Sequence, residues 1–259
     1  MTEPRAVADG AAADSVCGFA TGRTTTLLLD ADGTLFPSEE SAFEASALVT
    51  QALADHYRLA GDFRPGALRV ESTGKNFRST VGELLAAAGV SAAPADVERW
   101  IEREMLEVTA HLRATLRPSA QVSAALTRLS RRFRLAAVSS SASTRLTACF
   151  TACELDELVP PAVRYSAEDS LPSPLGKPDP AIYRHALAEL GVAADEAVAI
   201  EDSGSGVTSA VGAGIRTLGI VQYVPPAERA ERARQLRAAG AVAVVENWDD
   251  LADGLTSSR

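Results

Sequence analysis

The second half of the chain alternates helical stretches with short apolar runs. Helical patterns at 119–132, 181–191 and 205–214 are followed by the runs FRLAAVSSS, EAVAIED and IRTLGIV, and a last run reads AVAVVE. Strands that alternate with helices of about ten residues are typical of right-handed crossovers, which build a parallel sheet covered on both faces. This pattern predicts an α/β fold with a doubly wound parallel sheet.

An apolar run near the N-terminus predicts the first strand of this sheet. Residues 24–30 read TTTLLLD, and leucines next to β-branched residues are typical of a strand buried on both faces. The run ends in Asp30, and Asp32 and Gly33 come next. A lone DxDG pattern is more often a turn, because aspartate caps turns and glycine accepts a positive φ. The two aspartates therefore indicate a functional site only if the ends of the other predicted strands also carry suitable residues.

Between residues 38 and 117 the pattern changes to helices. The segments 38–57, 81–90 and 96–116 carry apolar residues at three- and four-residue spacing, and GALRVES is the one strand-like run among them. We expect a small all-helical domain, inserted after the first strand and ending before Pro118. The expected division is a flexible leader at 1–22, an α/β core at 23–37 and 118–259, and a helical cap at 38–117.

Composition excludes several classes of protein. The chain of 259 residues is 46% hydrophobic and has a net charge of -9, which opposes attraction to a nucleic-acid backbone or an anionic membrane. No apolar stretch approaches the roughly 20 residues that span a bilayer, and the N-terminus does not resemble a secretory signal. Three cysteines are too few for a disulfide framework. We expect a cytoplasmic protein, either a monomer or a small homo-oligomer, with no nucleic-acid or membrane partner.

Ligands of an open parallel sheet bind at the carboxyl ends of its strands, and four places that follow apolar regions hold polar residues. Asp30 with Asp32, the serines at 139–141, and Glu201 with Asp202 directly follow runs named above, and Lys177 lies in VRYSAEDSLPSPLGKPDP, after a further apolar region. Helix capping or an ordinary loop explains each of them singly. Together they suit phosphoryl transfer, in which an anionic group is aligned and its charge neutralised. Mg²⁺, which binds carboxylates and water, is the expected cofactor.

The four pieces resemble, in their order, the motifs of the haloacid dehalogenase-like phosphatases. DADGTLFPSE is similar to the family's DxDGT motif, the serine after AAV to its second motif, the lysine of GKPDP to its third and EDSGSG to its fourth. The resemblance covers residues 24–225 and points to the helical-cap branch, which includes β-phosphoglucomutase and many sugar-phosphate phosphatases. It implies a Rossmann-like core with a helical cap, and a phosphatase acting on a small phosphorylated metabolite, such as a sugar or polyol phosphate.

The resemblance also implies a role for each motif residue. Asp30 attacks phosphorus and forms an aspartyl phosphate, and Asp32 protonates the leaving oxygen and later deprotonates water. Ser139 donates a hydrogen bond to a phosphoryl oxygen, and Lys177 neutralises the nucleophile and the phosphoryl group. The other implied assignments are Gly33 and Thr34 in the turn over the phosphate, Ser140 as a backbone donor, and Asp30, Asp32, Glu201 and Asp202 as metal ligands.

One segment of the insert stands out from its acidic and apolar surroundings. Lys75, Asn76 and Arg78 cluster in STGKNFRST. A solvated loop between helices explains this cluster, and so does a cap loop that contacts the leaving group of the substrate. Caps of the resembled family carry specificity residues at about this place, so these three residues are candidates for substrate binding.

Other functions remain open to different degrees. A phosphomutase is the nearest alternative, but β-phosphoglucomutase carries a histidine where this chain has Ala42. Dehalogenases of the family lack the second aspartate, which Asp32 supplies, and phosphonate hydrolysis requires a cap lysine, for which Lys75 is the one candidate. A non-enzymatic regulatory protein with a phosphorylated aspartate, such as a receiver domain, uses similar residues, but it is about half this length and has no helical insert.

Overall fold

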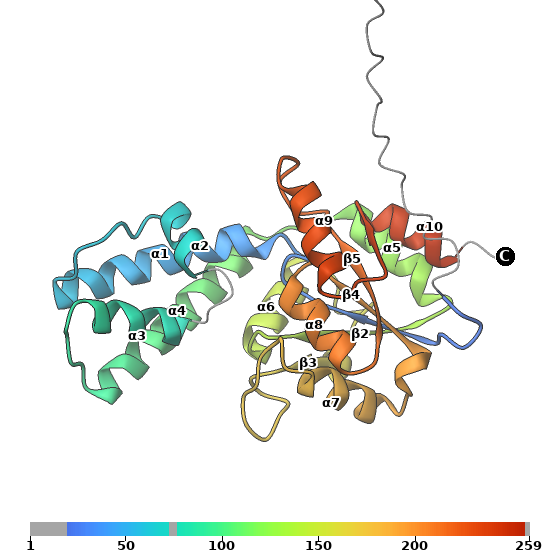
Figure 1. Ribbon diagram of the computed structural model, residues 1–259, viewed down its shortest axis with the longest axis horizontal. Coiled ribbons are helices and arrows are strands. Elements are labelled where there is room, and N and C mark those ends of the chain that lie inside the picture. Colours follow the sequence, from blue (N-terminus) through green and yellow to red (C-terminus); the bar gives the residue numbers. More distant parts are fainter. Residues whose placement is uncertain (1–19, 73–76, 257–259) are drawn as a thin grey trace, which may run out of the picture.

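The computed structural model describes residues 20–72 and 77–256 (Figure 1). Most of the predicted leader, together with Lys75 and Asn76, therefore lies outside the described residues. The strands of the α/β core are β1 Thr26–Leu29, β2 Arg134–Ser139, β3 Arg164–Ser166, β4 Ala197–Glu201, β5 Arg216–Ile220 and β6 Ala243–Val245. Its α-helices are α5 Ala120–Ser130, α6 Ser143–Ala152, α7 Ala181–Leu190, α8 Gly204–Gly212, α9 Arg229–Ala238 and α10 Trp248–Thr256.

The strands form one parallel six-stranded sheet in the order β3-β2-β1-β4-β5-β6. The chain runs outward from β1 to β3 and then returns to the other side of β1 with β4. The strand order thus reverses beside β1, and in such sheets ligands bind at the carboxyl ends of the strands next to this reversal. The predicted doubly wound parallel sheet is confirmed.

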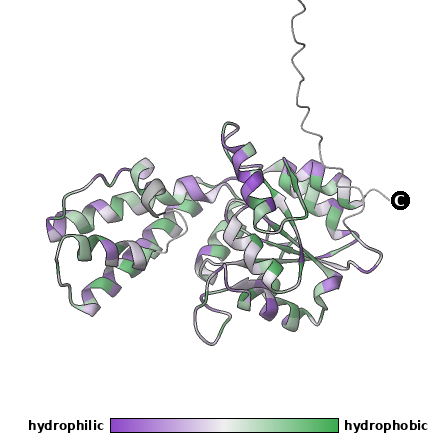
Figure 2. Cartoon of the chain, in the orientation of Figure 1, coloured by the Kyte–Doolittle hydropathy of each residue, from purple (hydrophilic) through white to green (hydrophobic). Residues whose placement is uncertain are grey.

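Helices cover both faces of the sheet because β1 is apolar on both. Leu27 and Leu29 face a core built with α5, α6 and α10, whereas Leu28 faces a second core built with α7 and α8. All three leucines are fully buried, as expected of a central parallel strand. In Figure 2 the strands are correspondingly green, and the helices show apolar and polar faces.

Four helices between β1 and α5 form a separate lobe, seen at the left of Figure 1. They are α1 Ser38–Tyr57, α2 Pro65–Ser72, α3 Phe77–Ala87 and α4 Pro94–Thr115. Leu53 of α1 packs with Val81 and Leu85 of α3 in a small core of this lobe. Val108 and Leu112 of α4 instead belong to the larger hydrophobic cluster on the face of the sheet that carries Leu27 and Leu29. This packing anchors the lobe on the α/β domain. The predicted helical cap is therefore present, and we propose 38–117 as its boundaries.

The prediction of a strand-like run at GALRVES was wrong. Residues 65–72 form α2, which begins at Pro65, where the missing N–H costs no helical hydrogen bond. Leu68 packs against Phe63 and against Ala47 and Ala54 of α1, and this packing decides between helix and strand. The first strand is also shorter than predicted, with Thr26–Leu29 in place of 24–30. None of the helices in the described residues is both long and apolar enough to cross a membrane.

Candidate active site

The first strand and the loop after it place two aspartates at the edge of the sheet. Asp30 comes directly after β1, and its N–H donates to the carbonyl of Ile200 on β4 at 3.0 Å. The chain then turns back on itself, because the N–H of Gly33 donates to the Phe36 carbonyl at 2.9 Å and that of Leu35 to the Ala31 carbonyl at 2.8 Å. This short loop holds Asp32 beside Asp30, away from the core.

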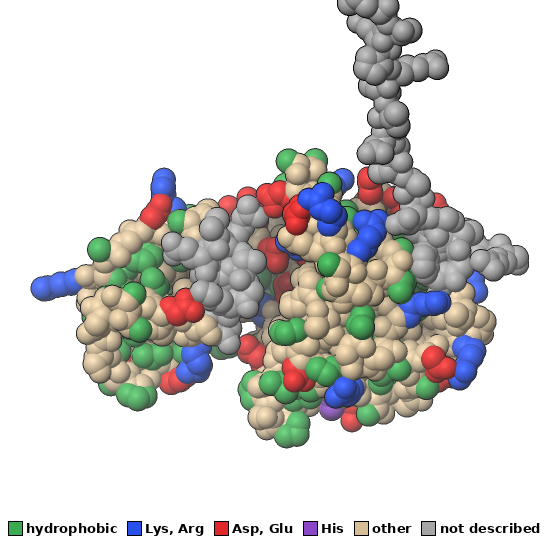
Figure 3. Space-filling view, viewed as in Figure 1, with side chains coloured by type: hydrophobic (Ala, Val, Ile, Leu, Met, Phe, Trp, Pro, Cys, Tyr) green, Lys and Arg blue, Asp and Glu red, His purple; other side chains and the backbone are tan. Residues whose placement is uncertain are grey.

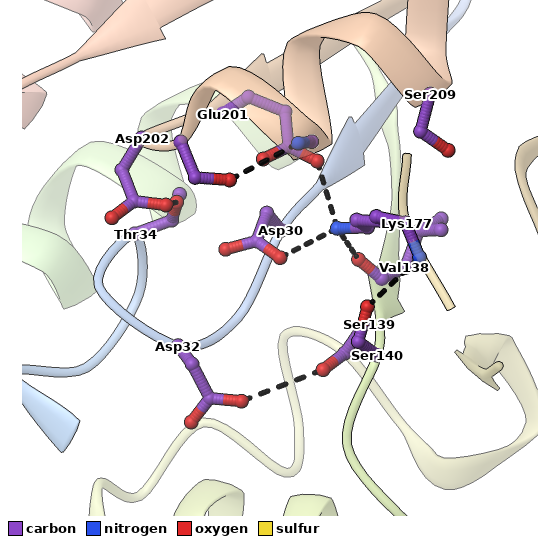
Figure 4. Close-up of polar contacts among 12 residues, drawn as sticks. Asp30, Asp32, Thr34, Val138, Ser139, Ser140, Lys177, Glu201, Asp202 and Ser209 are labelled. Carbon is purple, nitrogen blue, oxygen red and sulfur yellow. Dashed lines mark hydrogen bonds and ion pairs between the residues drawn. The ribbon is translucent and has the colours of Figure 1, made fainter. Parts of the chain in front are cut away.

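Lys177 Nζ lies at the centre of the buried polar groups (Figure 4). It donates to Asp30 Oδ1 at 2.6 Å, to Glu201 Oε1 at 2.7 Å and to the Val138 carbonyl at 2.8 Å. An ammonium has three N–H donors, so these contacts use all of them. The lysine side chain is 5% exposed, and it joins the carboxyl ends of β1, β2 and β4.

Glu201 and Asp202 bring two more carboxylates to Asp30. Glu201 ends β4 and accepts a second hydrogen bond from the Tyr183 hydroxyl. Asp202 is the next residue and accepts from the Thr34 hydroxyl at 3.4 Å, while its backbone carbonyl accepts from Arg232 of α9 at 2.9 Å. One oxygen of each of the three carboxylates lies within 4.8 Å of the others.

Burial governs the electrostatics of this cluster. It raises the pKa of Asp30, Glu201 and Asp202, although Lys177 opposes the effect on the first two. Burial alone would lower the pKa of Lys177, but the carboxylates of Asp30 and Glu201 raise it, so the side chain stays an ammonium at neutral pH. If every acid is ionised, three carboxylates face two cations, the Lys177 ammonium and the Arg232 guanidinium 3.9 Å from Asp202 Oδ2, and an excess of one negative charge remains.

The donor set fits a divalent cation. Among the described residues, no hydrogen-bond partner reaches the buried oxygens Asp30 Oδ2 and Glu201 Oε2. Buried acceptors without donors are costly, and a hard cation such as Mg²⁺ binds carboxylate oxygens. Its positive charge would also offset the excess negative charge of the cluster.

Asp32 stands apart from this cluster and is held by serines. Asp32 Oδ1 accepts from the Ser38 hydroxyl at 2.6 Å, and Asp32 Oδ2 accepts from the Ser141 hydroxyl at 2.7 Å. The Ser139 hydroxyl lies farther away, at 3.5 Å, and accepts the N–H of Ser141 at 3.0 Å. The Ser140 hydroxyl accepts the N–H of Lys177 at 3.3 Å, so the serine loop contacts both the lysine loop and Asp32.

The cap residues singled out in the sequence do not join this group. Arg78 lies on α3 and pairs with Glu98 on α4, with one N–H···O distance of 2.7 Å, and both side chains are more than half exposed. Lys75 and Asn76 lie outside the described residues. A role of these three residues in substrate binding therefore stays a prediction. Figure 3 shows a hollow between the cap and the core, with acidic side chains beside it.

Sequence reasoning missed several residues that hold the site together. The resemblance assigned no role to the residues that contact the acids: Ser38 and Ser141 on Asp32, Tyr183 on Glu201, and Arg232 on the Asp202 carbonyl. Trp248 Nε1 donates to the Thr34 carbonyl at 3.0 Å and fixes the loop after β1. Only Ser141 had a signal, its place in the serine run after β2, but helix capping explained that run equally well.

Comparisons with known proteins agree with this arrangement. The family model of haloacid dehalogenase-like hydrolases matches residues 24–214. CbbY from Rhodobacter sphaeroides, solved with phosphate, is 25% identical over 90% of this chain and 100% of that chain, with a TM-score of 0.69. A variant of CbbY, solved with xylulose-(1,5)bisphosphate, is 26% identical over 90% of this chain and 99% of that chain, with a TM-score of 0.68.

A conserved haloacid dehalogenase-like protein from Agrobacterium tumefaciens is also similar. It is 26% identical over 88% of this chain and 96% of that chain, with a TM-score of 0.66. No curated protein compared with the chain matches it significantly.

Proposed function

Because this chain belongs to the haloacid dehalogenase-like hydrolase family, we propose that it is a magnesium-dependent phosphatase that acts through an aspartyl phosphate. The proposal is carried by one observation, the buried contact of Lys177 with both Asp30 and Glu201. This contact keeps the ammonium protonated beside the carboxylate that would receive the phosphoryl group. A phosphoryl donor entering here meets a positive charge where its own negative charge must be neutralised.

In the first half-reaction, a carboxylate oxygen of Asp30 attacks phosphorus, and the bond from phosphorus to the leaving oxygen breaks. The electron pair of that bond stays on the leaving oxygen, which takes a proton from the carboxyl group of Asp32. Lys177 stabilises the charge on the transferring group, and Ser139 donates a hydrogen bond to it. The products of this step are the aspartyl phosphate of Asp30, ionised Asp32 and a free alcohol.

In the second half-reaction, a water oxygen attacks phosphorus of the aspartyl phosphate. The water proton passes to Asp32, and the bond from phosphorus to Asp30 breaks with its electron pair returning to the carboxylate. Inorganic phosphate leaves, and the starting protonation states are restored. The proposal gives both proton transfers to Asp32, whose two carboxylate oxygens accept hydrogen bonds from the hydroxyls of Ser38 and Ser141.

Asp30, Glu201 and Asp202, with the backbone carbonyl of Asp32, would hold the metal ion. Bound there, Mg²⁺ supplies charge neutralisation and alignment of the phosphoryl oxygens. The two carboxylate oxygens that lack donors in the described residues support this assignment.

The proposed substrate is a small phosphorylated metabolite, with a sugar or polyol phosphate preferred. The support is the 26% identical CbbY variant, whose structure contains xylulose-(1,5)bisphosphate. Mutase activity is less favoured, because Ala42 of α1 packs against the main core and offers no proton-transferring group. A cytoplasmic location and a monomeric or small oligomeric state stay predictions.

The test is a screen for phosphate release from sugar, polyol and nucleotide monophosphates, with Mg²⁺ and with a chelator. We expect release that requires the metal and that falls by roughly a thousandfold or more in Asp30→Asn, because the nucleophile is lost. Asp195→Asn is the matched control, since Asp195 is exposed and pairs with Arg23 far from the site. Full activity of Asp30→Asn, or isomer formation from a hexose phosphate without phosphate release, contradicts the proposal.

A further inference from the structure

Asp32 receives its hydrogen bonds from two different parts of the chain. Ser38 opens α1, the first helix of the cap, and is 1% exposed. Ser141 lies in the core, in the loop between β2 and α6. Their hydroxyls lie 2.6 Å and 2.7 Å from different oxygens of the same carboxylate. One close donor on each oxygen fixes both the position of the carboxyl group and the rotation of its plane.

Other groups of the site contribute little to the orientation of the Asp32 carboxyl group. Lys177 uses its three donors on Asp30, Glu201 and the Val138 carbonyl, so it has none for Asp32. The Ser139 hydroxyl is 3.5 Å away, at the outer limit of a hydrogen bond. Asp32 itself is only half-buried, so packing alone does not fix its rotamer.

The chemistry of serine suits a carboxyl group that changes its proton during each turnover. A hydroxyl is both a donor and an acceptor, and its hydrogen rotates to suit the partner. A serine that donates to an ionised carboxylate can therefore accept from the protonated acid without moving its oxygen. An ammonium or a guanidinium has donors only and lacks this property.

We propose that Ser38 and Ser141 are positioning residues for Asp32, which aim its carboxyl group at the leaving oxygen in the first half-reaction. The inference rests on the proposed function, because it assumes that Asp32 transfers a proton to the departing alcohol. It adds a role for two residues to which the resemblance assigned none. It also assigns Ser141 a role that nearby Ser143 does not share. Ser143 is exposed, and within the described residues its hydroxyl makes no hydrogen bond to Asp32.

The dependence of the rate on the leaving group separates positioning from a structural role. p-Nitrophenol leaves readily as an anion, whereas phenol is a poorer leaving group that gains more from a proton donor. p-Nitrophenyl phosphate and phenyl phosphate are nearly the same size, so both probe the same site. The measured quantity is kcat/KM, because it reports the steps up to departure of the alcohol and not the later hydrolysis of the aspartyl phosphate.

We expect Ser141→Ala to lower kcat/KM for phenyl phosphate about tenfold or more, and to change kcat/KM for p-nitrophenyl phosphate about twofold or less. Ser38→Ala should show the same selective loss. Ser141→Thr, which keeps the hydroxyl, should restore the rate on phenyl phosphate, and Ser143→Ala should leave both rates unchanged. Because Ser38 and Ser141 lie on separate elements, the second variant provides the test if the first fails to fold.

Two outcomes overturn the inference. An equal fall in kcat/KM on both esters in Ser38→Ala and Ser141→Ala shows a general effect on structure or binding, and no fall on either ester shows that the hydroxyls are dispensable. Wild-type protein that hydrolyses neither ester and releases no phosphate in the substrate screen contradicts the proposed function itself, and the role of the serines falls with it. Activity of the wild-type protein on both esters therefore distinguishes failure of the serine role from failure of the phosphatase assignment.

Discussion

Two glycines leave the space that the carboxylate cluster occupies, because a side chain at either position would clash with an acid. A Cβ built on Gly33 would lie 2.2 Å from Asp202 Oδ2, and one on Gly206 would lie 1.8 Å from Glu201 Oε2. Gly33 also has a φ of +78°, which side chains other than glycine rarely adopt. Close approach of the backbone to an acid, as much as turn geometry, requires glycine at these positions.

We expect Gly206→Ala to lower kcat/KM for phosphate release at least about tenfold, because the added methyl group must push Glu201 away from Lys177 and Asp30. Gly204→Ala is the matched control at the start of the same helix, since nothing lies within 4 Å of a Cβ there. The control should stay within about twofold of the wild type. Equal losses in the two variants would show that flexibility of this helix end matters, and not the space beside Glu201.

At the scale of elements, the cap depends on the packing of α1. This helix presents Leu53, fully buried against α3, and Leu48, which is 69% exposed. The opposite end of the cap joins the core through Val108 and Leu112 of α4. The outer part of the cap therefore has its own small core, while its base shares the main one.

Leu53→Ala should lower the free energy of unfolding by about 2–5 kcal/mol, because it leaves a cavity in a small core. Leu48→Ala, on the exposed face of the same helix, should stay within about 0.5 kcal/mol of the wild type. Denaturant unfolding followed by circular dichroism measures both values. A separate early transition in Leu53→Ala would show that the cap unfolds independently of the core, and equal stabilities would contradict the assigned burial.

At the scale of the whole molecule, folding without a metal ion buries three carboxylates whose ionised forms are destabilised by that burial. The folded state raises the pKa of Asp30, Glu201 and Asp202 above their ordinary values, mainly through burial. It therefore holds more protons than the unfolded chain above about pH 4, so the free energy of unfolding falls as pH rises through the window between the unfolded and folded pKa values. A divalent cation that binds only the folded state reverses this loss.

The melting temperature should therefore respond to Mg²⁺ more strongly at about pH 8 than at about pH 5. Metal-free protein should melt at a lower temperature at the higher pH, and saturating Mg²⁺ should recover most of the difference. Asp202→Asn removes one of the three acids, so its melting temperature should depend less on both pH and Mg²⁺. An equal response to Mg²⁺ at the two pH values would argue against a metal site built from these carboxylates.

The sequence alone determined the fold class and the family, and both predictions are confirmed. The reason is that a central parallel strand needs an apolar run, such as LLL of β1, and that the four motifs occur together in one order, although a turn, a cap or a loop explains each of them singly. Asp30, Glu201 and Asp202 lie together because the parallel strands β1 and β4 end at one edge, and the loop between β3 and α7 brings Lys177 to them. Their catalytic roles stay part of the proposed function.

Tertiary structure decided what no local pattern encodes. GALRVES forms a helix because Leu68 packs against α1. Arg78 forms an ion pair with Glu98 within the cap. The partners of Asp32 come from positions 38 and 141, which are brought together only when the loop after β1 folds back beside β2. Hydrogen bonds between distant segments depend on where the backbone brings them, and a serine in a sequence gives no sign of which carboxylate its hydroxyl will meet.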